Sequence, residues 1–165
     1  MAVAWHAVKI SPFKQGDSCL VLGGGPIGLA VVQILKAKGA GKIIVSELAS
    51  RRREFAKQFG ADHVLDPTKD DIPARVRELC NNKGANLAYD AAGVQAGLDQ
   101  AILSVRARGT IVNIAVWEKS ATFIPNHLAF RERKYMGIAT YVDGDFQEVI
   151  DAIASGEQLI HHLDE

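Results

Sequence analysis

The sequence predicts an α/β fold in which a doubly wound parallel sheet carries helices on both faces. Short apolar runs alternate with segments of helical periodicity along nearly all of the 165 residues. Such alternation is typical of parallel strands joined by right-handed crossovers. A glycine-rich turn follows the first apolar run, and an acidic residue follows the second. Six strands with this turn after the first fit the strand order 3-2-1-4-5-6.

The expected strands are six apolar runs bounded by turn residues. They occupy residues 19–22, 42–47, 62–65, 85–90, 110–116 and 134–140. Their nearly continuous apolar character is typical of parallel strands that are buried on both faces.

Helical spacing of apolar residues predicts the segments between the strands. An N-terminal helix is expected at residues 2–8, and the helix after the glycine turn presents one apolar face formed by Ile27, Ala30, Val31, Ile34 and Leu35. Ser50 is the expected N-cap of the next helix. Residues 117–133 are expected to be irregular, with one helical turn. Further helices are expected at residues 72–80, 94–105 and 146–153, the last one ending at Gly156.

The turn after the first strand, Gly23-Gly-Gly-Pro-Ile-Gly28, has the spacing of a dinucleotide phosphate site. Gly23 permits the tight turn, Gly25 lets the backbone approach a pyrophosphate, and Gly28 lets the helix pack closely on the strand. Pro26 suits the first helical turn, where a missing N–H costs little. Free N–H groups and the helix dipole would hold the anion. The glycine pattern alone is a weak signal, but its strand–turn–helix context predicts a Rossmann nucleotide site.

Glu47 lies at the end of the second strand, 19 residues after Gly28. An acid at this point accepts hydrogen bonds from the adenosine ribose hydroxyls and would repel a 2′-phosphate, so we expect NAD rather than NADP. The alternative is that Glu47 caps the following helix or faces solvent. Arg51, Arg52 and Arg53 lie close by and could accommodate a 2′-phosphate, although a solvated helix face accounts for at least two of them.

Composition and charge argue against several classes of partner. Lys plus Arg and Asp plus Glu balance at 19 each, so nothing predicts a nucleic acid or an anionic membrane as a partner. No apolar run reaches the ~18 residues needed to span a bilayer, and the first residues lack the pattern of a signal peptide. Cys19 and Cys80 are the only cysteines, too few for a disulfide framework or a four-thiolate zinc site. A reducing, cytoplasmic setting is therefore expected.

The run from Pro12 to Gly28 closely resembles the cofactor domain of zinc-type alcohol dehydrogenases in the medium-chain dehydrogenase/reductase family. The resemblance covers about residues 2–157 and continues through the segments 45–47, 59–67, 89–93 and 109–118. Within the family, the sequence is most similar to the branch of the butanediol and sorbitol dehydrogenases.

The resemblance implies a role for each position that matches the family pattern. Backbone N–H groups of the glycine turn would approach the pyrophosphate, and Glu47 and Arg52 would hold the adenosine end. Ile114 and Val116 would border the nicotinamide, with simple core packing as the alternative. From the motif and the resemblance together, the expected cofactor-binding residues are Gly23, Gly25, Pro26, Ile27, Gly28, Glu47, Arg52, Ala91, Ala92, Val94, Ile114 and Val116.

The resemblance also implies NAD-dependent oxidation of a small alcohol, diol or polyol by hydride transfer to nicotinamide. The zinc of these enzymes and its Cys, His and Glu ligands belong to a separate catalytic domain. We therefore interpret residues 1–165 as an isolated dinucleotide-binding domain, with no catalytic and no metal-binding residue of its own. The five histidines are spread without ligand spacing at His6, His63, His127, His161 and His162.

The family resemblance further implies a homodimer, because cofactor domains of this family pair through the edge strand. Here that strand is expected from Lys134 to Thr140. Ordinary packing within one chain is the alternative explanation for its apolar residues.

Two other functions are compatible with a glycine turn followed by an acid. A regulatory domain that senses NAD without chemistry would fit the length of the chain. It would not explain a resemblance that begins and ends at a domain boundary. A methyltransferase would also place a glycine-rich turn after its first strand, but Gly23-x-Gly25-x-x-Gly28 has the dinucleotide spacing. The cofactor domain of a dehydrogenase is the function we expect.

Overall fold

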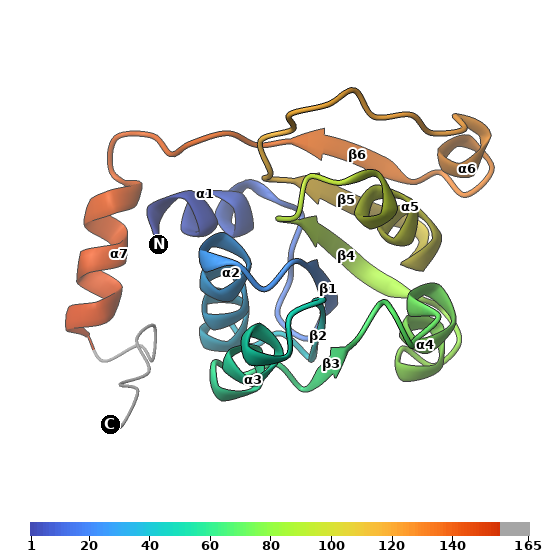
Figure 1. Ribbon diagram of the computed structural model, residues 1–165. Coiled ribbons are helices and arrows are strands. Elements are labelled where there is room, and N and C mark those ends of the chain that lie inside the picture. Colours follow the sequence, from blue (N-terminus) through green and yellow to red (C-terminus); the bar gives the residue numbers. More distant parts are fainter. Residues whose placement is uncertain (156–165) are drawn as a thin grey trace.

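Six parallel strands form the centre of the computed structural model, which describes residues 1–155 (Figure 1). The strands lie in the order β3-β2-β1-β4-β5-β6, and every neighbouring pair is parallel. This confirms the order predicted from the sequence. The strands are β1 (Ser18–Leu22), β2 (Lys42–Ser46), β3 (His63–Leu65), β4 (Ala85–Asp90), β5 (Val105–Asn113) and β6 (Lys134–Gly137).

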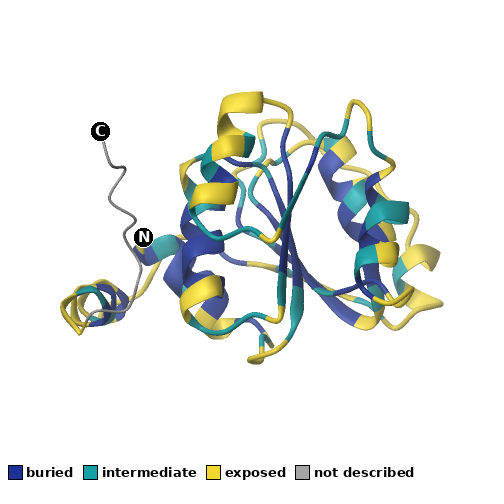
Figure 2. Cartoon of the chain, turned by 90° about the horizontal axis from the view of Figure 1, so that it is seen from below, coloured by how far each residue is buried: buried dark blue, intermediate teal, exposed yellow. Residues whose placement is uncertain are grey.

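Helices cover both faces of the sheet, as Figure 2 shows. Helices α1 and α2 contribute to the core on one face, and α4 and α5 contribute to the core on the other. The helices are α1 (Ala2–Ile10), α2 (Pro26–Ala37), α3 (Ser50–Gln58), α4 (Ile72–Leu79), α5 (Gln95–Ser104), α6 (Asn126–Ala129) and α7 (Asp145–Ala154). None of these helices is long and apolar enough to span a membrane.

Alternating residues of the central strands divide between the two cores. On β1, Val21 belongs to the core beneath α1 and α2, whereas Leu20 and Leu22 belong to the core beneath α4 and α5. All three side chains are at most 2% exposed. Burying one such side chain contributes roughly 1.5–3 kcal/mol, so the sheet needs apolar residues on both of its faces. This explains why the strand sequences are nearly continuous apolar runs.

Some of the expected element boundaries are wrong. Ser50 is the first residue of α3 and not its cap. Ala49 stands at the N-cap position, without a side-chain hydrogen bond. The strand expected at residues 110–116 begins earlier, at Val105, and ends at Asn113. Its pairing with β4 shifts register between Ala85 and Leu87, so two short pairings replace one continuous run.

The sixth strand is shorter than expected and ends at Gly137 instead of Thr140. Thr140 has a φ of +59°, which is incompatible with an extended strand. The helical turn expected within residues 117–133 is confirmed as α6. The predicted helix end at Gly156, and the histidines His161 and His162, lie outside the described residues.

The strand order brings three loops together at the carboxyl ends of the strands. The chain moves from β1 to β2 on one side and later returns to place β4 on the other side of β1. Loops at the carboxyl ends of β1 and β4 therefore diverge, which leaves a crevice at this switch point. The turn after β1, the loop after β2 and the turn after β4 all meet there.

Candidate functional site

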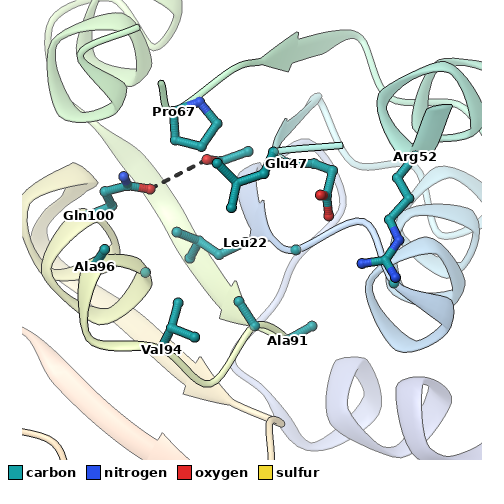
Figure 3. A pocket seen from close by; sticks show the side chains of 14 residues that line it. Leu22, Glu47, Arg52, Pro67, Ala91, Val94, Ala96 and Gln100 are labelled. Carbon is teal, nitrogen blue, oxygen red and sulfur yellow. Dashed lines mark hydrogen bonds between the residues drawn. The ribbon is translucent and has the colours of Figure 1, made fainter. Parts of the chain in front are cut away.

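A cavity of about 390 Å³ lies at the carboxyl ends of β1, β2 and β4. In Figure 3, Val94, Ala96 and Gln100 lie on one side of it, and Glu47 and Arg52 lie on the other. Its walls come from strand ends, the loops after them and the first turns of two helices. The lining residues are Leu22, Gly23, Gly25, Ser46, Glu47, Leu48, Arg52, Pro67, Ala91, Ala92, Val94, Ala96, Gly97 and Gln100.

The glycine turn leaves backbone open to this cavity. Gly23 has a φ of +92°, a left-handed conformation that favours glycine. Gly25 is the N-cap of α2, and a Cβ built on it would meet no atom within 4 Å. The first turn of α2 therefore faces open space, where the helix dipole and backbone N–H groups can hold an anion. The turn fits a pyrophosphate.

Pro26, Ile27 and Gly28 continue from this turn but do not line the cavity. Pro26 faces a second hollow of about 560 Å³, and Gly25 and Arg52 line both hollows. Ile27 is partly buried against the core. Gly28 is buried close to Gly23, so its contribution to the site is the close packing of helix on strand.

Glu47 lies in the wall of the cavity and is only 7% exposed. Its Oε2 accepts a hydrogen bond from the Gly24 N–H at 2.5 Å, and its Oε1 accepts one from the Ala49 N–H at 2.8 Å. The carboxylate thus connects the glycine turn to the residue that precedes α3. Each carboxylate oxygen can accept a further hydrogen bond, so the group can still receive two hydroxyls. The alternative in which Glu47 faces solvent is wrong.

The three arginines after Glu47 have different surroundings. Arg51 is exposed, with its guanidinium carbon 5.7 Å from the centre of the Phe55 ring. Arg52 is also exposed but lines the cavity. Arg53 is less exposed, and its guanidinium donates to backbone carbonyls and contacts Asp66. Of the three, only Arg52 is placed to meet a ligand in the cavity.

The turn after β4 brings Ala91, Ala92 and Val94 to the cavity. Asp90, fully buried at the end of β4, shapes this turn: its Oδ1 accepts from the Ala92 N–H at 3.0 Å and from the Gly93 N–H at 3.1 Å. Burial raises the pKa of the Asp90 carboxyl above its ordinary value. Small side chains after Asp90 leave room for a flat apolar group beside Leu22.

Ile114 and Val116 are not in this cavity. Ile114 is 7% exposed and belongs to the core beneath α1 and α2. Val116 is 92% exposed and lines a neighbouring hollow of about 570 Å³, together with Ala92, Gly93 and Val94. Val116 is therefore adjacent to the site, whereas the surroundings of Ile114 fit the core-packing alternative.

Half of the cavity wall was not anticipated from the sequence. The additional residues are Leu22, Ser46, Leu48, Pro67, Ala96, Gly97 and Gln100. Leu22, Ser46, Leu48 and Pro67 lie at or just after the ends of predicted strands, which was the available signal for them. Ala96, Gly97 and Gln100 lie in α5, and their signal was the predicted helix after Val94. Ser46 Oγ donates to Gln100 Oε1 at 3.4 Å, which links two of these lining residues (Figure 3).

The arrangement suits binding more than bond-making chemistry. It combines an apolar slot, one buried carboxylate, one exposed guanidinium and an open helix N-terminus. These are groups that recognise a flat ring, vicinal hydroxyls and phosphates. Within residues 1–155, no three His, Cys, Asp or Glu side chains are grouped so that they could hold a metal ion.

Comparison with known proteins gives consistent matches. Residues 26–155 match a family described as zinc-binding dehydrogenase. An (R,R)-butanediol dehydrogenase of Saccharomyces cerevisiae is 42% identical over 161 residues, covering 95% of this chain and 42% of the yeast protein.

Solved structures share the fold. The crystal structure of 2R,3R-butanediol dehydrogenase from Bacillus subtilis has a TM-score of 0.89 at 39% identity, over 95% of this chain and 45% of that chain. A Sinorhizobium meliloti protein bound to NADP has a TM-score of 0.88 at 27% identity, over 98% of this chain and 47% of that chain. The chain thus spans less than half the length of these relatives.

Proposed function

The chain belongs to the zinc-binding dehydrogenase family, and on this premise we propose that it is the cofactor-binding domain of an NAD-dependent alcohol or polyol dehydrogenase. The observation that carries the proposal is the position of Glu47. Its buried carboxylate shares one cavity with the open backbone of Gly25. A ribose diol at Glu47 and a pyrophosphate at Gly25 are adjacent parts of a dinucleotide, because the adenosine ribose is joined directly to the pyrophosphate.

Bound NAD would supply the hydride acceptor, the nicotinamide ring. The residues of this chain would bind and orient it. The glycine turn holds phosphate, Glu47 holds the adenosine ribose, and the small residues Ala91 and Ala92 border the slot for the flat base. Val94 lines both this cavity and the hollow of about 570 Å³ beside Val116, so we assign the hollow beside Val116 to the nicotinamide end.

Glu47 also favours NAD over NADP in this proposal. A 2′-phosphate would lie next to a buried carboxylate, and two like charges at such a distance repel. Arg52 lines the same cavity and offers a compensating positive charge. The relative from Sinorhizobium meliloti shares the fold and is bound to NADP, so the fold alone does not choose between the two cofactors. We propose that Glu47 and Arg52 make this choice.

We propose a small alcohol or diol as the substrate of the whole protein, since relatives of this chain are named butanediol dehydrogenases. We place the zinc and its ligands in a catalytic domain outside residues 1–165 and expect no alcohol oxidation from these residues alone. We also propose a homodimer that pairs through β6, and a cytoplasmic setting. No observation favours the regulatory alternative.

Titration of the purified chain with NADH and NADPH tests the cofactor proposal. We expect saturable NADH binding with one site per chain, and NADPH binding weaker by about tenfold. Isothermal calorimetry gives both affinities and the stoichiometry. The proposal is wrong if neither dinucleotide binds. Tighter binding of NADPH would overturn the assignment of NAD while leaving the nucleotide site intact.

A further inference from the structure

The loop that carries Glu47 is held in place by polar contacts. This loop, residues 47–49, connects β2 to α3. Leu48 is 65% exposed, so apolar packing does not hold the loop in place. The N–H of Glu47 donates to the Leu65 carbonyl at 3.1 Å, which extends the pairing of β2 with β3 by one residue. The carbonyl of Ala49 accepts from the Arg53 N–H at 3.0 Å, as part of the first turn of α3. The carbonyls of Glu47 and Leu48 depend on another partner.

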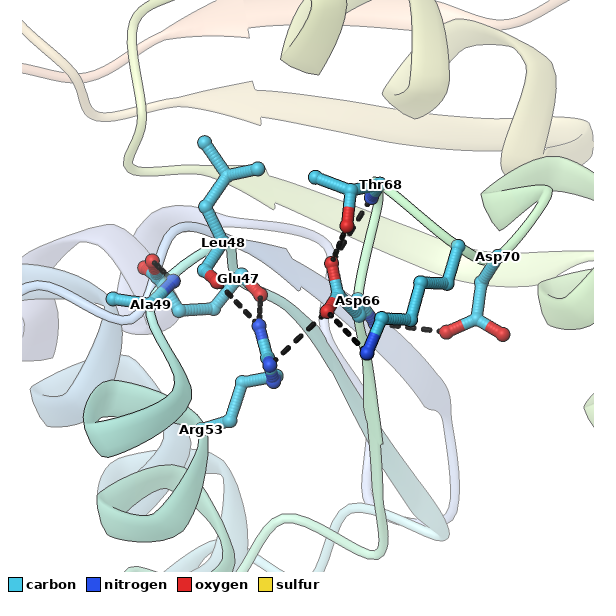
Figure 4. A network of polar contacts seen from close by, with 8 residues as sticks. Glu47, Leu48, Ala49, Arg53, Asp66, Thr68 and Asp70 are labelled. Atoms are coloured by element: carbon cyan, nitrogen blue, oxygen red, sulfur yellow. Dashed lines mark hydrogen bonds and ion pairs between the residues drawn. The ribbon is translucent and has the colours of Figure 1, made fainter.

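Arg53 is that partner (Figure 4). It lies in the first turn of α3, and its guanidinium reaches back over the start of the helix. Nη1 donates to the Glu47 carbonyl at 2.9 Å and also to the Leu48 carbonyl. One planar guanidinium thus holds two consecutive carbonyls, which fixes the direction in which the Glu47 side chain leaves the backbone.

Asp66 holds Arg53 from the other side. Arg53 Nη2 lies 3.1 Å from Asp66 Oδ2, and the two side chains are only 20% and 14% exposed. Asp66 Oδ1 accepts hydrogen bonds from the Thr68 N–H at 3.0 Å and the Thr68 hydroxyl at 2.6 Å. These Thr68 hydrogen bonds hold the pKa of the Asp66 carboxyl below its ordinary value, and Arg53 acts in the same direction. The ion pair is therefore partly shielded from water, and the Thr68 hydrogen bonds hold the Asp66 carboxylate in place.

The contacts of Arg53 with the 47–49 loop and with Asp66 also connect two walls of the cavity. Pro67 follows Asp66 directly and lines the cavity, as do Glu47 and Leu48 from the other loop. The Asp66 N–H donates to Asp70 Oδ2 at 2.8 Å, so the segment after β3 is itself fixed. Arg53 and Asp66 lie behind these walls and do not line the cavity.

We propose that Arg53 and Asp66 are positioning residues that hold Glu47 and Pro67 at the separation required by the adenosine end of the dinucleotide. The proposal rests on the proposed cofactor site. Arg53 acts through the Glu47 backbone and makes no contact with the cofactor. Arg52, its neighbour in sequence, is the residue exposed to the ligand.

Amide exchange in the absence of any cofactor provides the first test. The N–H groups of Gly24 and Ala49 donate to the Glu47 carboxylate, so their exchange rates report its position. In Arg53→Gln we expect both amides to exchange about tenfold faster than in the wild type. Arg51→Gln is the matched control, because Arg51 is exposed on the same helix and lies over the Phe55 ring. Unchanged exchange at both amides in Arg53→Gln would overturn the proposal.

A double-mutant cycle for NADH binding provides the second test. We expect Arg53→Gln to weaken NADH binding about tenfold in the wild-type background, and to have little further effect when Glu47 is already Gln. A merely structural role would cost the same factor in both backgrounds, and that result would contradict the proposal. A wild-type chain that does not bind NADH would refute the proposed function, whereas the exchange experiment would still decide the role of Arg53.

Asp66→Asn covers the case in which Arg53→Gln does not fold. The neutral amide keeps an oxygen that can accept from Thr68 but removes the charge that holds Arg53. We expect faster exchange at Ala49 and weaker NADH binding, with smaller changes than for Arg53→Gln. Wild-type behaviour of Asp66→Asn in both measurements would exclude Asp66 from the positioning role.

Discussion

Gly28 lies directly against the carbonyl group of Gly23: a Cβ built on Gly28 would be 1.9 Å from the Gly23 carbonyl oxygen. No side chain fits at that distance, so the first turn of α2 can approach the end of β1 only with a glycine here. The contact places the helix N-terminus at the cavity. The tight packing at Gly28 and the open space at Gly25 are therefore two consequences of one backbone arrangement.

Gly28→Ala should destabilise the fold. The added methyl group forces α2 away from the Gly23 carbonyl, and strain of this kind in a packed region costs about 1–3 kcal/mol. Urea denaturation of the wild type and the variant measures the change. An unchanged midpoint would show that the helix can shift without cost.

Gly25→Ala should separate binding from stability. Gly25 has a φ of −75°, and a Cβ added to it would have no atom within 4 Å, so alanine fits the folded chain. The new methyl group occupies open space at a residue that lines the cavity, where we place the pyrophosphate. We expect an unchanged unfolding midpoint and at least about tenfold weaker NADH binding, measured by calorimetry. Full retention of NADH affinity would place the phosphate elsewhere.

Glu47→Gln should shift cofactor preference toward NADP. The substitution keeps the size of the side chain but removes the charge that repels a 2′-phosphate, and Arg52 then remains as the nearby cation in the cavity. We expect the NADPH affinity to rise about tenfold while the NADH affinity falls. Adding Arg52→Gln should remove the gain. An unchanged ratio of the two affinities would count against the ribose role of Glu47.

Asp145 should make stability depend on pH in the acid range. It is fully buried between α7 and α1: its Oδ2 accepts from the Val142 N–H at 2.8 Å, and Lys9 Nζ lies 3.2 Å from its Oδ1. The Val142 hydrogen bond, with help from Lys9 and His6, lowers the pKa of the Asp145 carboxyl in the folded chain. A lowered pKa means that this stabilisation is present above the unfolded value of about 3.9 and is lost as pH falls through the folded value.

Asp145→Asn should therefore lower the melting temperature by several degrees at pH 7. The difference from the wild type should persist down to about pH 4 and shrink below it, because this carboxyl then becomes protonated in the unfolded wild-type chain and, at still lower pH, in the folded chain. Asp143→Asn is the matched control, since Asp143 is an exposed acid two residues away. A difference that stays constant to pH 2 would show that shape, and not charge, is what Asp145 contributes.

The β6 edge should mediate the proposed pairing of two chains. Tyr135 is 40% exposed on this edge strand and stacks on Phe123, with ring centres 6.4 Å apart. We expect a dimer by light scattering and a monomer for Tyr135→Lys, because lysine on an edge strand disfavours strand pairing. Ile10→Lys, at an exposed position of α1, should leave the mass unchanged. A wild-type chain that stays monomeric at high concentration would refute the pairing.

Much of the fold was predictable because its determinants are local in sequence. The alternation of apolar runs with helical periodicity indicated parallel strands, and the position of the glycine turn indicated the strand order. Boundaries were less predictable where the partner strand decides them. The start of β5 at Val105 depends on pairing with Ala85 and on a register shift against β4, which no local pattern records.

The sequence by itself determined the strand order, the glycine turn and the acid that follows β2, since glycine spacing and strand periodicity act over a few residues. Only the tertiary structure decided which side chains face the cavity. It placed Arg52 at the cavity and Arg53 against Asp66, buried Ile114 in the core, and brought Leu22 and Gln100 to the same cavity. The direction of a side chain depends on how each helix is rotated against the sheet, and that rotation is set by packing between residues distant in the chain.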